Sequence, residues 1–321
     1  MAGQTLPATV RNASKLSAML DLKTLRSLLQ EYGAALDAPV REFDIGGRPF
    51  AFNRRKTLMG VINLSTDSWY RESVCRTEGE AIQRGLELVQ QGADWVDIGA
   101  ESTLPGAERV GTAGQIDRLV PVIRALASRG IPCSVESYDP AVIEAAALAG
   151  ARIFNLTGFA AEERVLRLAA RFDAAVVLCY LQGEHVRQVG NFEFADDVTE
   201  EQERYFREHV ARANALGVQR LIVDPGLGFY YRNLEDGALR VNYQIHTFLN
   251  AFRWNRLGYP VLNILPHAPE IFGPEHRRAA EPFFAVLAML GGTHIVRTHE
   301  MAVVAKVRAV LDAYVGRPPA M

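Results

Sequence analysis

One short stretch decides the fold that we expect for this chain: residues 221–229 read Leu-Ile-Val-Asp-Pro-Gly-Leu-Gly-Phe. The three apolar residues at its start are typical of a buried strand, and the acid, proline and glycines that follow are typical of a turn. Asp224 therefore stands where a buried strand ends. In a barrel of alternating strands and helices this end faces the ligand, so Asp224 is either a ligand contact or a carboxylate that caps the next loop.

The same strand-then-helix unit is repeated eight times from residue 57 onward. The expected strands span residues 58–62, 95–98, 133–136, 152–155, 175–179, 221–224, 261–264 and 293–297. Segments with apolar residues at helical spacing separate them. Eight such units predict an α/β fold of the TIM-barrel type. An open, doubly wound sheet is the alternative, but it fits eight even units poorly, and no G-x-G-x-x-G follows the first strand.

Two elements precede the expected barrel. Leucines recur at helical spacing in residues 20–29 and predict an amphipathic helix that packs on the main domain or on a second subunit. Residues 43–53 predict a short hairpin, turning at Gly46 and Gly47, that plugs the bottom of the barrel. We therefore expect an N-terminal extension of residues 1–42, a barrel domain of residues 43–316 and a tail of residues 317–321.

The composition is typical of a globular protein and argues against a nucleic-acid-binding, membrane or secreted protein. The 321 residues are 49% hydrophobic, and the formal net charge of -2 gives no general attraction for nucleic acid or an anionic membrane. No apolar run approaches the roughly 20 residues of a membrane span, and no apolar segment with a cleavage site is seen near residue 1. Cys75, Cys133 and Cys179 lie far apart, as expected for reduced thiols. We expect a cytoplasmic protein.

Polar side chains stand at the carboxyl ends of the expected strands. They are Asn63, Glu101 with Ser102 and Thr103, Glu136, Asn155, Tyr180, Asp224, His267, and Arg297 with His299. Each has a structural explanation when taken alone: Asn155 could bond to its own turn, and His299 could cap the last helix. Because the carboxyl ends of barrel strands meet at one mouth, the whole set predicts a polar ligand site there.

Six motifs identify a family. They are residues 59–68 (Met-Gly-Val-Ile-Asn-Leu-Ser-Thr-Asp-Ser), 97–106 (Asp-Ile-Gly-Ala-Glu-Ser-Thr-Leu-Pro-Gly), 134–138 (Ser-Val-Glu-Ser-Tyr), 155–158 (Asn-Leu-Thr-Gly), 224–229 (Asp-Pro-Gly-Leu-Gly-Phe) and 297–300 (Arg-Thr-His-Glu). In this order they resemble the dihydropteroate synthases, and the resemblance covers residues 43–316. It implies a TIM barrel that joins 6-hydroxymethyl-dihydropterin pyrophosphate to p-aminobenzoate, using magnesium and releasing pyrophosphate.

The resemblance also implies a pterin pocket. The pterin ring offers a row of donors and acceptors on its N1, 2-amino and N3 edge, which a buried carboxylate and a neighbouring amide can match. Asp224, Asn155 and Glu136 would supply that row, with Glu136 standing where the family has an aspartate. The full set of expected pterin-binding residues is Glu136, Asn155, Asp224, Phe229, Thr103 and Tyr180.

A second group of residues would hold the pyrophosphate. By resemblance, Asn63 binds the magnesium ion, while Arg297 and His299 bind the phosphates. His267, if protonated, would replace part of the positive charge that the family places nearby. We therefore expect Arg297, His299 and His267 to act in catalysis.

The chain departs from the family where the family carries cations. Leu104 replaces an arginine, Tyr230-Tyr231 replaces Gly-Lys, and Pro266-His267-Ala268 replaces Ser-Arg-Lys. Cations that face a departing pyrophosphate stabilise the charge that develops on it, so their loss bears on the reaction itself. Aromatic residues occupy the expected mouth loops instead, which suits a planar ring: Trp69, Tyr70, Tyr138, Tyr180, Tyr230 and Tyr231.

Three functions fit these residues. The first is a synthase of the dihydropteroate type, with p-aminobenzoate or a related arylamine. The second is a pterin- or folate-dependent enzyme of another reaction type, such as one-carbon transfer or oxidation. The third is a non-catalytic pterin-binding subunit. A metal site formed by Glu136, Asp224, His267 and His299 is a further alternative.

The segment 283–290 has an unusually broad apolar surface, with Phe283, Phe284, Val286, Leu287, Met289 and Leu290. An exposed apolar patch of this kind marks an interface with another protein. Because barrels of the resembling family commonly pair through helices near the C-terminus, we expect a homodimer.

Overall fold

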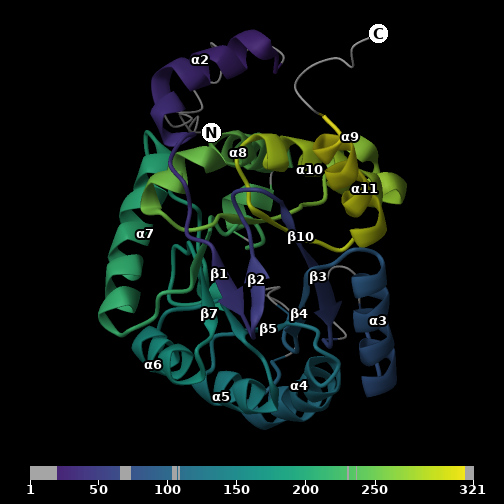
Figure 1. The fold of residues 1–321 in the computed structure, drawn as a ribbon. Coiled ribbons are helices and arrows are strands. Elements are labelled where there is room, and N and C mark those ends of the chain that lie inside the picture. Colours follow the sequence, from purple (N-terminus) through teal and green to yellow (C-terminus); the bar gives the residue numbers. More distant parts are fainter. Residues whose placement is uncertain are drawn as a thin grey trace, which may run out of the picture.

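Eight parallel strands form a barrel in the computed structural model, which describes residues 20–65, 74–102, 107, 109–229, 231–235 and 237–314 (Figure 1). The strands are β3 Thr57–Asn63, β4 Trp95–Gly99, β5 Cys133–Ser137, β6 Ile153–Leu156, β7 Ala175–Cys179, β8 Leu221–Asp224, β9 Leu262–Ile264 and β10 Ile295–Thr298. They pair in the order β8-β7-β6-β5-β4-β3-β10-β9, and a parallel bridge between Val223 and Val261 brings the two end strands together. The predicted TIM barrel is confirmed.

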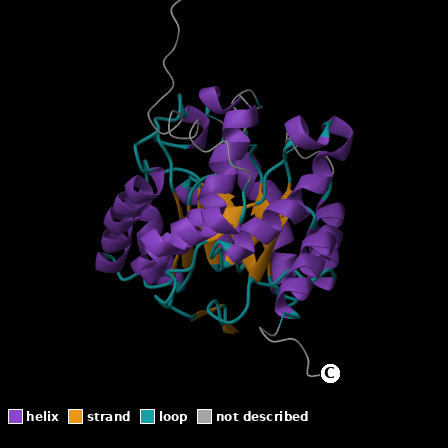
Figure 2. Cartoon of the chain, turned by 90° about the horizontal axis from the view of Figure 1, so that it is seen from above, coloured by secondary structure: helices purple, strands orange, loops and turns teal. Residues whose placement is uncertain are grey.

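Helices surround the strands on all sides (Figures 1 and 2). They are α3 Glu78–Gln90, α4 Thr112–Ala127, α5 Pro140–Ala149, α6 Glu162–Phe172, α7 Val198–Ala215, α8 Gly237–Asn250, α10 Ala280–Leu290 and α11 Met301–Asp312. Shorter helices lie in the connections: η1 Gly33–Ala35, η3 Val186–Gln188, η4 Arg232–Glu235, η5 Ala251–Leu257, α9 Pro269–Phe272 and η6 Pro274–Ala279. Within the described ranges, no helix combines the length and the apolar character that crossing a membrane requires.

Local sequence explains where these helices begin and end. In α5, for example, the Asp139 side chain accepts a hydrogen bond from the backbone N–H of Ala141, and Pro140 occupies the first turn. The helix ends at Gly150, whose φ of 116° is readily adopted only by glycine. The short connection that results leads directly from α5 into β6.

The hairpin is confirmed at the bottom of the barrel. Strands β1 Phe43–Ile45 and β2 Arg48–Phe50 pair in antiparallel fashion around Gly46 and Gly47, which both have positive φ. In Figure 1 the hairpin lies across the centre of the ring of helices, and in Figure 2 it lies below the barrel strands. Phe50 packs edge-on against Trp95, with 4.9 Å between ring centroids, so the hairpin closes the lower end of the barrel core.

The predicted N-terminal helix is also confirmed, as α2 Leu22–Tyr32. Asp21 caps it by accepting hydrogen bonds from the backbone N–H groups of Lys23 and Thr24, each at 2.9 Å. The ring of Tyr32 lies 3.7 Å from the guanidinium carbon of Arg253 in η5. The helix therefore contacts the barrel domain through this cation–π pair, and none of its residues is fully buried: Leu25 and Leu28 are half-buried, and Leu22 and Leu29 are exposed.

A buried carboxylate joins several elements at the bottom of the barrel. Asp94, 3% exposed, precedes β4 and accepts a hydrogen bond from the backbone N–H of Leu58 at 2.9 Å. Arg55 and Arg308 donate to it at 2.8 and 3.0 Å, and Arg48 lies 3.6 Å away. The hairpin, β3 and α11 therefore all depend on this one charge.

We expect Asp94→Asn to lower the free energy of unfolding by roughly 2 to 3 kcal/mol, because the arginines lose the negative charge that they share and one of its two acceptor oxygens becomes an N–H donor. Chemical denaturation measures the change. The control is Asp44→Asn on the exposed face of the hairpin, which should change stability by less than about 0.5 kcal/mol. Equal effects of the two substitutions would contradict the prediction.

Candidate active site

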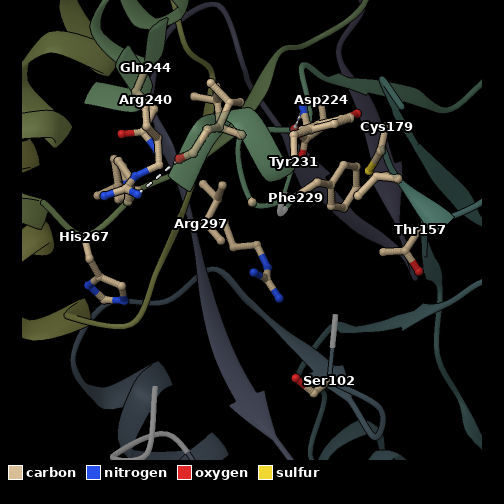
Figure 3. Close-up of a pocket in the computed structure, with 18 of the residues that line it drawn as sticks. Ser102, Thr157, Cys179, Asp224, Phe229, Tyr231, Arg240, Gln244, His267 and Arg297 are labelled. Atoms are coloured by element: carbon tan, nitrogen blue, oxygen red, sulfur yellow. Dashed lines mark hydrogen bonds between the residues drawn. The ribbon is translucent and has the colours of Figure 1, made fainter. Parts of the chain in front are cut away.

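A cavity of about 840 Å³ opens at the carboxyl ends of the strands (Figure 3). Among its lining residues are these members of the predicted site: Asn63, Glu136, Asn155, Asp224, Phe229, His267, Arg297 and His299. They converge because side chains alternate along a strand. Ile222 packs inside the barrel, so Asp224, two residues further on, points to the same inner face at its upper end.

Arg297 stands at the centre of a buried network. Its Nε donates to Asp97 Oδ2 at 2.8 Å, and its Nη2 donates to Glu136 Oε2 at 2.5 Å. Asp97, fully buried, also accepts hydrogen bonds from Ser134 Oγ at 2.6 Å and from Asn155 Nδ2 at 3.1 Å. The network holds both the carboxylate of Glu136 and the amide of Asn155 in fixed positions at the cavity wall.

The turn after β8 fixes Asp224. One oxygen of Asp224 accepts a hydrogen bond from the backbone N–H of Gly226 at 2.7 Å. Gly226 has a φ of 77°, and a Cβ there would lie 2.2 Å from the backbone oxygen of Tyr180. Only glycine fits, so the Pro-Gly of the motif sets the direction of the Asp224 side chain.

Burial shifts the pKa values of the acidic side chains in the cavity. It raises the pKa of Glu136 to about 7, against the opposing effect of the Arg297 charge. It raises the pKa of Asp224 to about 6, against the hydrogen bond from Gly226. Burial alone would lower the pKa of Arg297, but the charges of Glu136 and Asp97 outweigh it and raise that pKa, so the guanidinium stays protonated. A charged guanidinium thus lies near two carboxyl groups, Glu136 and Asp224, whose pKa values are raised toward neutral pH.

These shifts predict a pH dependence of stability. Between their ordinary pKa values of 3.8 and 4.5 and the raised values of about 6 and about 7, Asp224 and Glu136 hold protons in the folded protein that the unfolded chain has lost. The folded state binds more protons in this window, so the free energy of unfolding falls as pH rises through it. We expect the pair to contribute a fall of roughly 5 kcal/mol from pH 4.5 to pH 7.5.

The measurement is the difference between wild type and the double variant Asp224→Asn, Glu136→Gln, in denaturation at both pH values. The difference between the two proteins cancels the contribution of the surface acids, whose effect on stability has the opposite pH dependence. The wild type should lose more stability than the double variant as pH rises. Parallel profiles would show that these two groups do not titrate in this way.

Two histidines, His267 and His299, also line the cavity. The ring centroids of His267 and His299 are 6.1 Å apart. Glu281 of α10, fully buried, accepts hydrogen bonds from the hydroxyl of Thr298 and, at 3.2 Å, from the backbone N–H of His299. Its other oxygen lies 3.4 Å from His299 Nδ1. Glu281 thereby orients His299, a role signalled only by a lone acid in an apolar helix.

Loops that are far apart in the sequence meet across the mouth. Arg187 follows β7, and its side chain, 4% exposed, donates to the backbone oxygens of Ser102, at 2.9 Å, and of Ala107. Its Nη1 lies 3.6 Å from Glu101, whose other oxygen accepts a hydrogen bond from the hydroxyl of Tyr138 at 2.9 Å. Arg187 lines the cavity, yet its loop carries no motif, and sequence analysis missed it.

Tyr180 corrects one prediction. Its side chain, 3% exposed, does not line the cavity but donates a hydrogen bond to Glu201 at 2.8 Å and packs edge-on against Tyr205. It points outward because the preceding residue, Cys179, faces the barrel interior, and neighbours on a strand point to opposite sides. Thr103, also expected to bind the pterin, lies outside the described residues, as do Trp69, Tyr70, Leu104 and Tyr230.

The alternative metal site is wrong. Within the described part of the chain, no three His, Cys, Asp or Glu side chains are placed to hold a metal ion. Glu136 is bound to Arg297 and Asp224 to Gly226, whereas His299 lies beside Glu281. These groups are separately engaged, so they do not converge on one ion.

Comparisons with known proteins agree with this geometry. Residues 59–299 match the family described as pterin binding enzyme. The barrel and its buried polar site, together with this match, define the class of protein. The chain belongs to the family of pterin-binding enzymes. Within it, the chain is 30% identical over 264 residues to dihydropteroate synthase of Escherichia coli, covering 80% of this chain and 90% of the relative. It is 32% identical over 269 residues to that of Mycobacterium leprae, with the same coverage.

Solved structures give the same result. Dihydropteroate synthase of Xanthomonas albilineans with 4-aminobenzoic acid is 31% identical, with a TM-score of 0.72, and the match covers 87% of this chain and all of that one. The complex of the same species with 7,8-dihydropteroate is 28% identical, with a TM-score of 0.68, and covers 86% and 99%. The chain is thus similar to dihydropteroate synthases along nearly their whole length.

Proposed function

We propose that this protein is a transferase of the dihydropteroate synthase type. It binds 6-hydroxymethyl-dihydropterin pyrophosphate and an arylamine in the cavity above the barrel. The observation that carries the proposal is the buried set of Asp224, Asn155 and Glu136 around Arg297, which offers paired hydrogen bonds to the edge of a pterin ring. The similarity to dihydropteroate synthases supports the same reaction, and no comparison favours one-carbon transfer, oxidation or a non-catalytic role.

The reaction forms one bond and breaks one. The amine nitrogen attacks the methylene carbon of the pterin ester, and the carbon–oxygen bond to pyrophosphate breaks, with its electron pair leaving on that oxygen. The amine loses a proton. Negative charge therefore builds on the leaving group, so the positive groups of the cavity should act there. Among the strand-end residues, Arg297 carries such a charge, and the ring N–H groups of His267 and His299 would donate hydrogen bonds to the leaving oxygens.

The site fits a magnesium ion bound mainly through the substrate. Mg²⁺ commonly takes one or two protein oxygens together with phosphate oxygens and water. Asn63 ends β3 and lines the cavity, so its amide oxygen would be such a ligand. A magnesium ion bound there would neutralise charge on the departing pyrophosphate.

The test is pyrophosphate release from dihydropterin pyrophosphate and p-aminobenzoate, with and without magnesium. Amine-dependent release that requires the metal is the expected result. Tight binding of a reduced pterin without any release, with p-aminobenzoate or another arylamine, would refute the transferase and favour a pterin-binding role. We place the reaction in the cytoplasm, because Cys75, Cys133 and Cys179 are buried and form no disulfide.

We propose a homodimer through α10 and α11. Phe283 and Leu290 of α10 are 62% and 65% exposed, and Val310 of α11 is 72% exposed. The rest of the predicted apolar set is buried or half-buried against the barrel, as Phe284 is, so the exposed surface is narrower than the sequence indicates. These side chains still support a patch that a second copy would cover.

We expect the double variant Phe283→Glu, Leu290→Glu to be monomeric, because two charges would be buried in the interface. Light scattering after size exclusion measures the mass. Leu148→Glu, at a 69% exposed leucine on α5, is the control and should leave the dimer intact. A monomeric wild type at micromolar concentration would exclude the interface.

A further inference from the structure

The loops after β6 and β7 are bonded to each other on one side of the cavity mouth. The backbone N–H of Phe159 donates to the oxygen of Glu184 at 2.9 Å. The backbone N–H of Val186 donates to the oxygen of Thr157 at 2.8 Å. Residues 157–159 and 184–187 therefore form one unit, which we call the loop wall.

A glycine permits this close approach of the two loops. A Cβ on Gly158 would lie 2.5 Å from the Cβ of His185, nearer than such atoms come in proteins. The ring of His185 stacks on Tyr138 in the loop after β5, with 4.7 Å between the centroids and 10° between the planes. A larger residue at position 158 would push the loops apart, so the glycine that ends the motif at 155–158 serves the loop wall.

Arg187 joins the loop wall to the loop after β4. Its side chain, 4% exposed, donates to the backbone oxygens of Ser102, at 2.9 Å, and of Ala107. These two residues stand on either side of positions 103–106 in the sequence, so one guanidinium holds both ends of that stretch. The planar fork of arginine suits two acceptors at once, and the carboxylate of Glu101, 3.6 Å away, offsets its charge.

This contact lies over the residues that we propose bind the pterin. Strands β5 and β6 stand between β4 and β7 in the barrel. A side chain that reaches from the loop after β7 to Ser102 therefore spans the ends of β5 and β6, which carry Glu136 and Asn155. Arg187, Glu136 and Asn155 line the same cavity, and in Figure 3 Ser102 and Thr157 mark this side of it.

We propose that Arg187 is a positioning residue for the pterin. By holding the loop after β4 against the loop wall, it closes the cavity over Glu136 and Asn155. Water is then kept from the hydrogen bonds that these two side chains make with the ring, and such bonds are stronger in less polar surroundings. The proposal rests on the proposed function for the identity of the ligand.

The test replaces Arg187 in the full chain and measures the binding of a dihydropterin by calorimetry. We expect Arg187→Met to weaken binding about tenfold. Arg187→Lys should be weakened as well, because an ammonium group keeps the charge but cannot span both backbone oxygens. The control is Arg152→Met at the opposite end of the barrel, where the guanidinium also donates to two backbone oxygens, and it should bind as wild type does.

Two further readouts separate positioning from a general loss of stability. The backbone N–H of Val110 donates to Glu101 at 3.2 Å, so its hydrogen exchange reports on the loop after β4. In Arg187→Met, exchange should accelerate at Val110 by at least about tenfold more than at Val176, whose N–H is bonded within the barrel. In steady state, the KM for the pterin ester should rise, while kcat should change by less than about threefold.

The outcomes decide the proposal in each case. Wild-type affinity in Arg187→Met, full recovery in Arg187→Lys, or equal acceleration of exchange at Val110 and Val176 would overturn it. Gly158→Ala opens the loop wall without touching Arg187, and wild-type affinity there would overturn the proposal even if Arg187→Met does not fold. Weaker dihydropterin binding in these variants, with no pyrophosphate release by wild type, would support the loop wall and refute the synthase. A wild type that binds no dihydropterin would overturn both.

Discussion

Turnover should fall by about 100-fold or more when Arg297 is replaced by methionine, which has nearly the same length and no charge. The guanidinium lines the cavity in which we propose that the pyrophosphate leaves, and it also pairs with Asp97 and Glu136. The steady-state rate of pyrophosphate release is the measurement. The control is Arg308→Met at the opposite end of the barrel, which should lower stability and leave turnover unchanged, since Arg308 contacts Asp94.

A second variant separates the two roles of Arg297. In Arg297→Met, the buried carboxylate of Glu136 loses its partner, and adding Glu136→Gln removes that unpaired charge. If Arg297 also stabilises the leaving group, the double variant should stay slow. Recovery of turnover in the double variant would show that Arg297 only balances Glu136.

Binding of a dihydropterin should weaken by roughly 2 to 4 kcal/mol in Asp224→Asn. A carboxylate accepts from two donors of the ring edge, whereas an amide turns one of those contacts into two facing donors. The hydrogen bond from Gly226 can remain, because the asparagine keeps one oxygen, so the turn after β8 should keep its shape. Calorimetry with a dihydropterin gives the change in dissociation constant.

The control for this change is Asp139→Asn at the N-cap of α5, outside the cavity, which should leave affinity unchanged. Asn155→Ala should also weaken binding, and its effect should not add to that of Asp224→Asn, because both residues serve one edge of the ring. Full additivity, or an Asp224→Asn variant with wild-type affinity, would remove Asp224 from the pterin pocket.

Local sequence determined that the chain forms a barrel and that the ligand site lies at the carboxyl ends of its strands. Runs such as residues 221–224 and 175–179 are short, β-rich and bounded by turn residues, and they became strands with those bounds. Side chains alternate along a strand, and parallel strands end at one face of the barrel. Closure of the barrel therefore necessarily brings together the side chains of Asp224, Asn155 and Glu136. Patterns of this kind depend only on neighbours in the sequence.

Tertiary structure alone decided how the charges of the site are paired. Asp97 and Arg297 stand 200 residues apart, and no pattern shows that one guanidinium binds Asp97 and Glu136 together. The same is true of Arg187, which crosses from the loop after β7 to the backbone of Ser102. Hydrogen bonds and ion pairs act over a few ångströms, so their partners are set by where the closed barrel places each side chain and not by spacing along the chain.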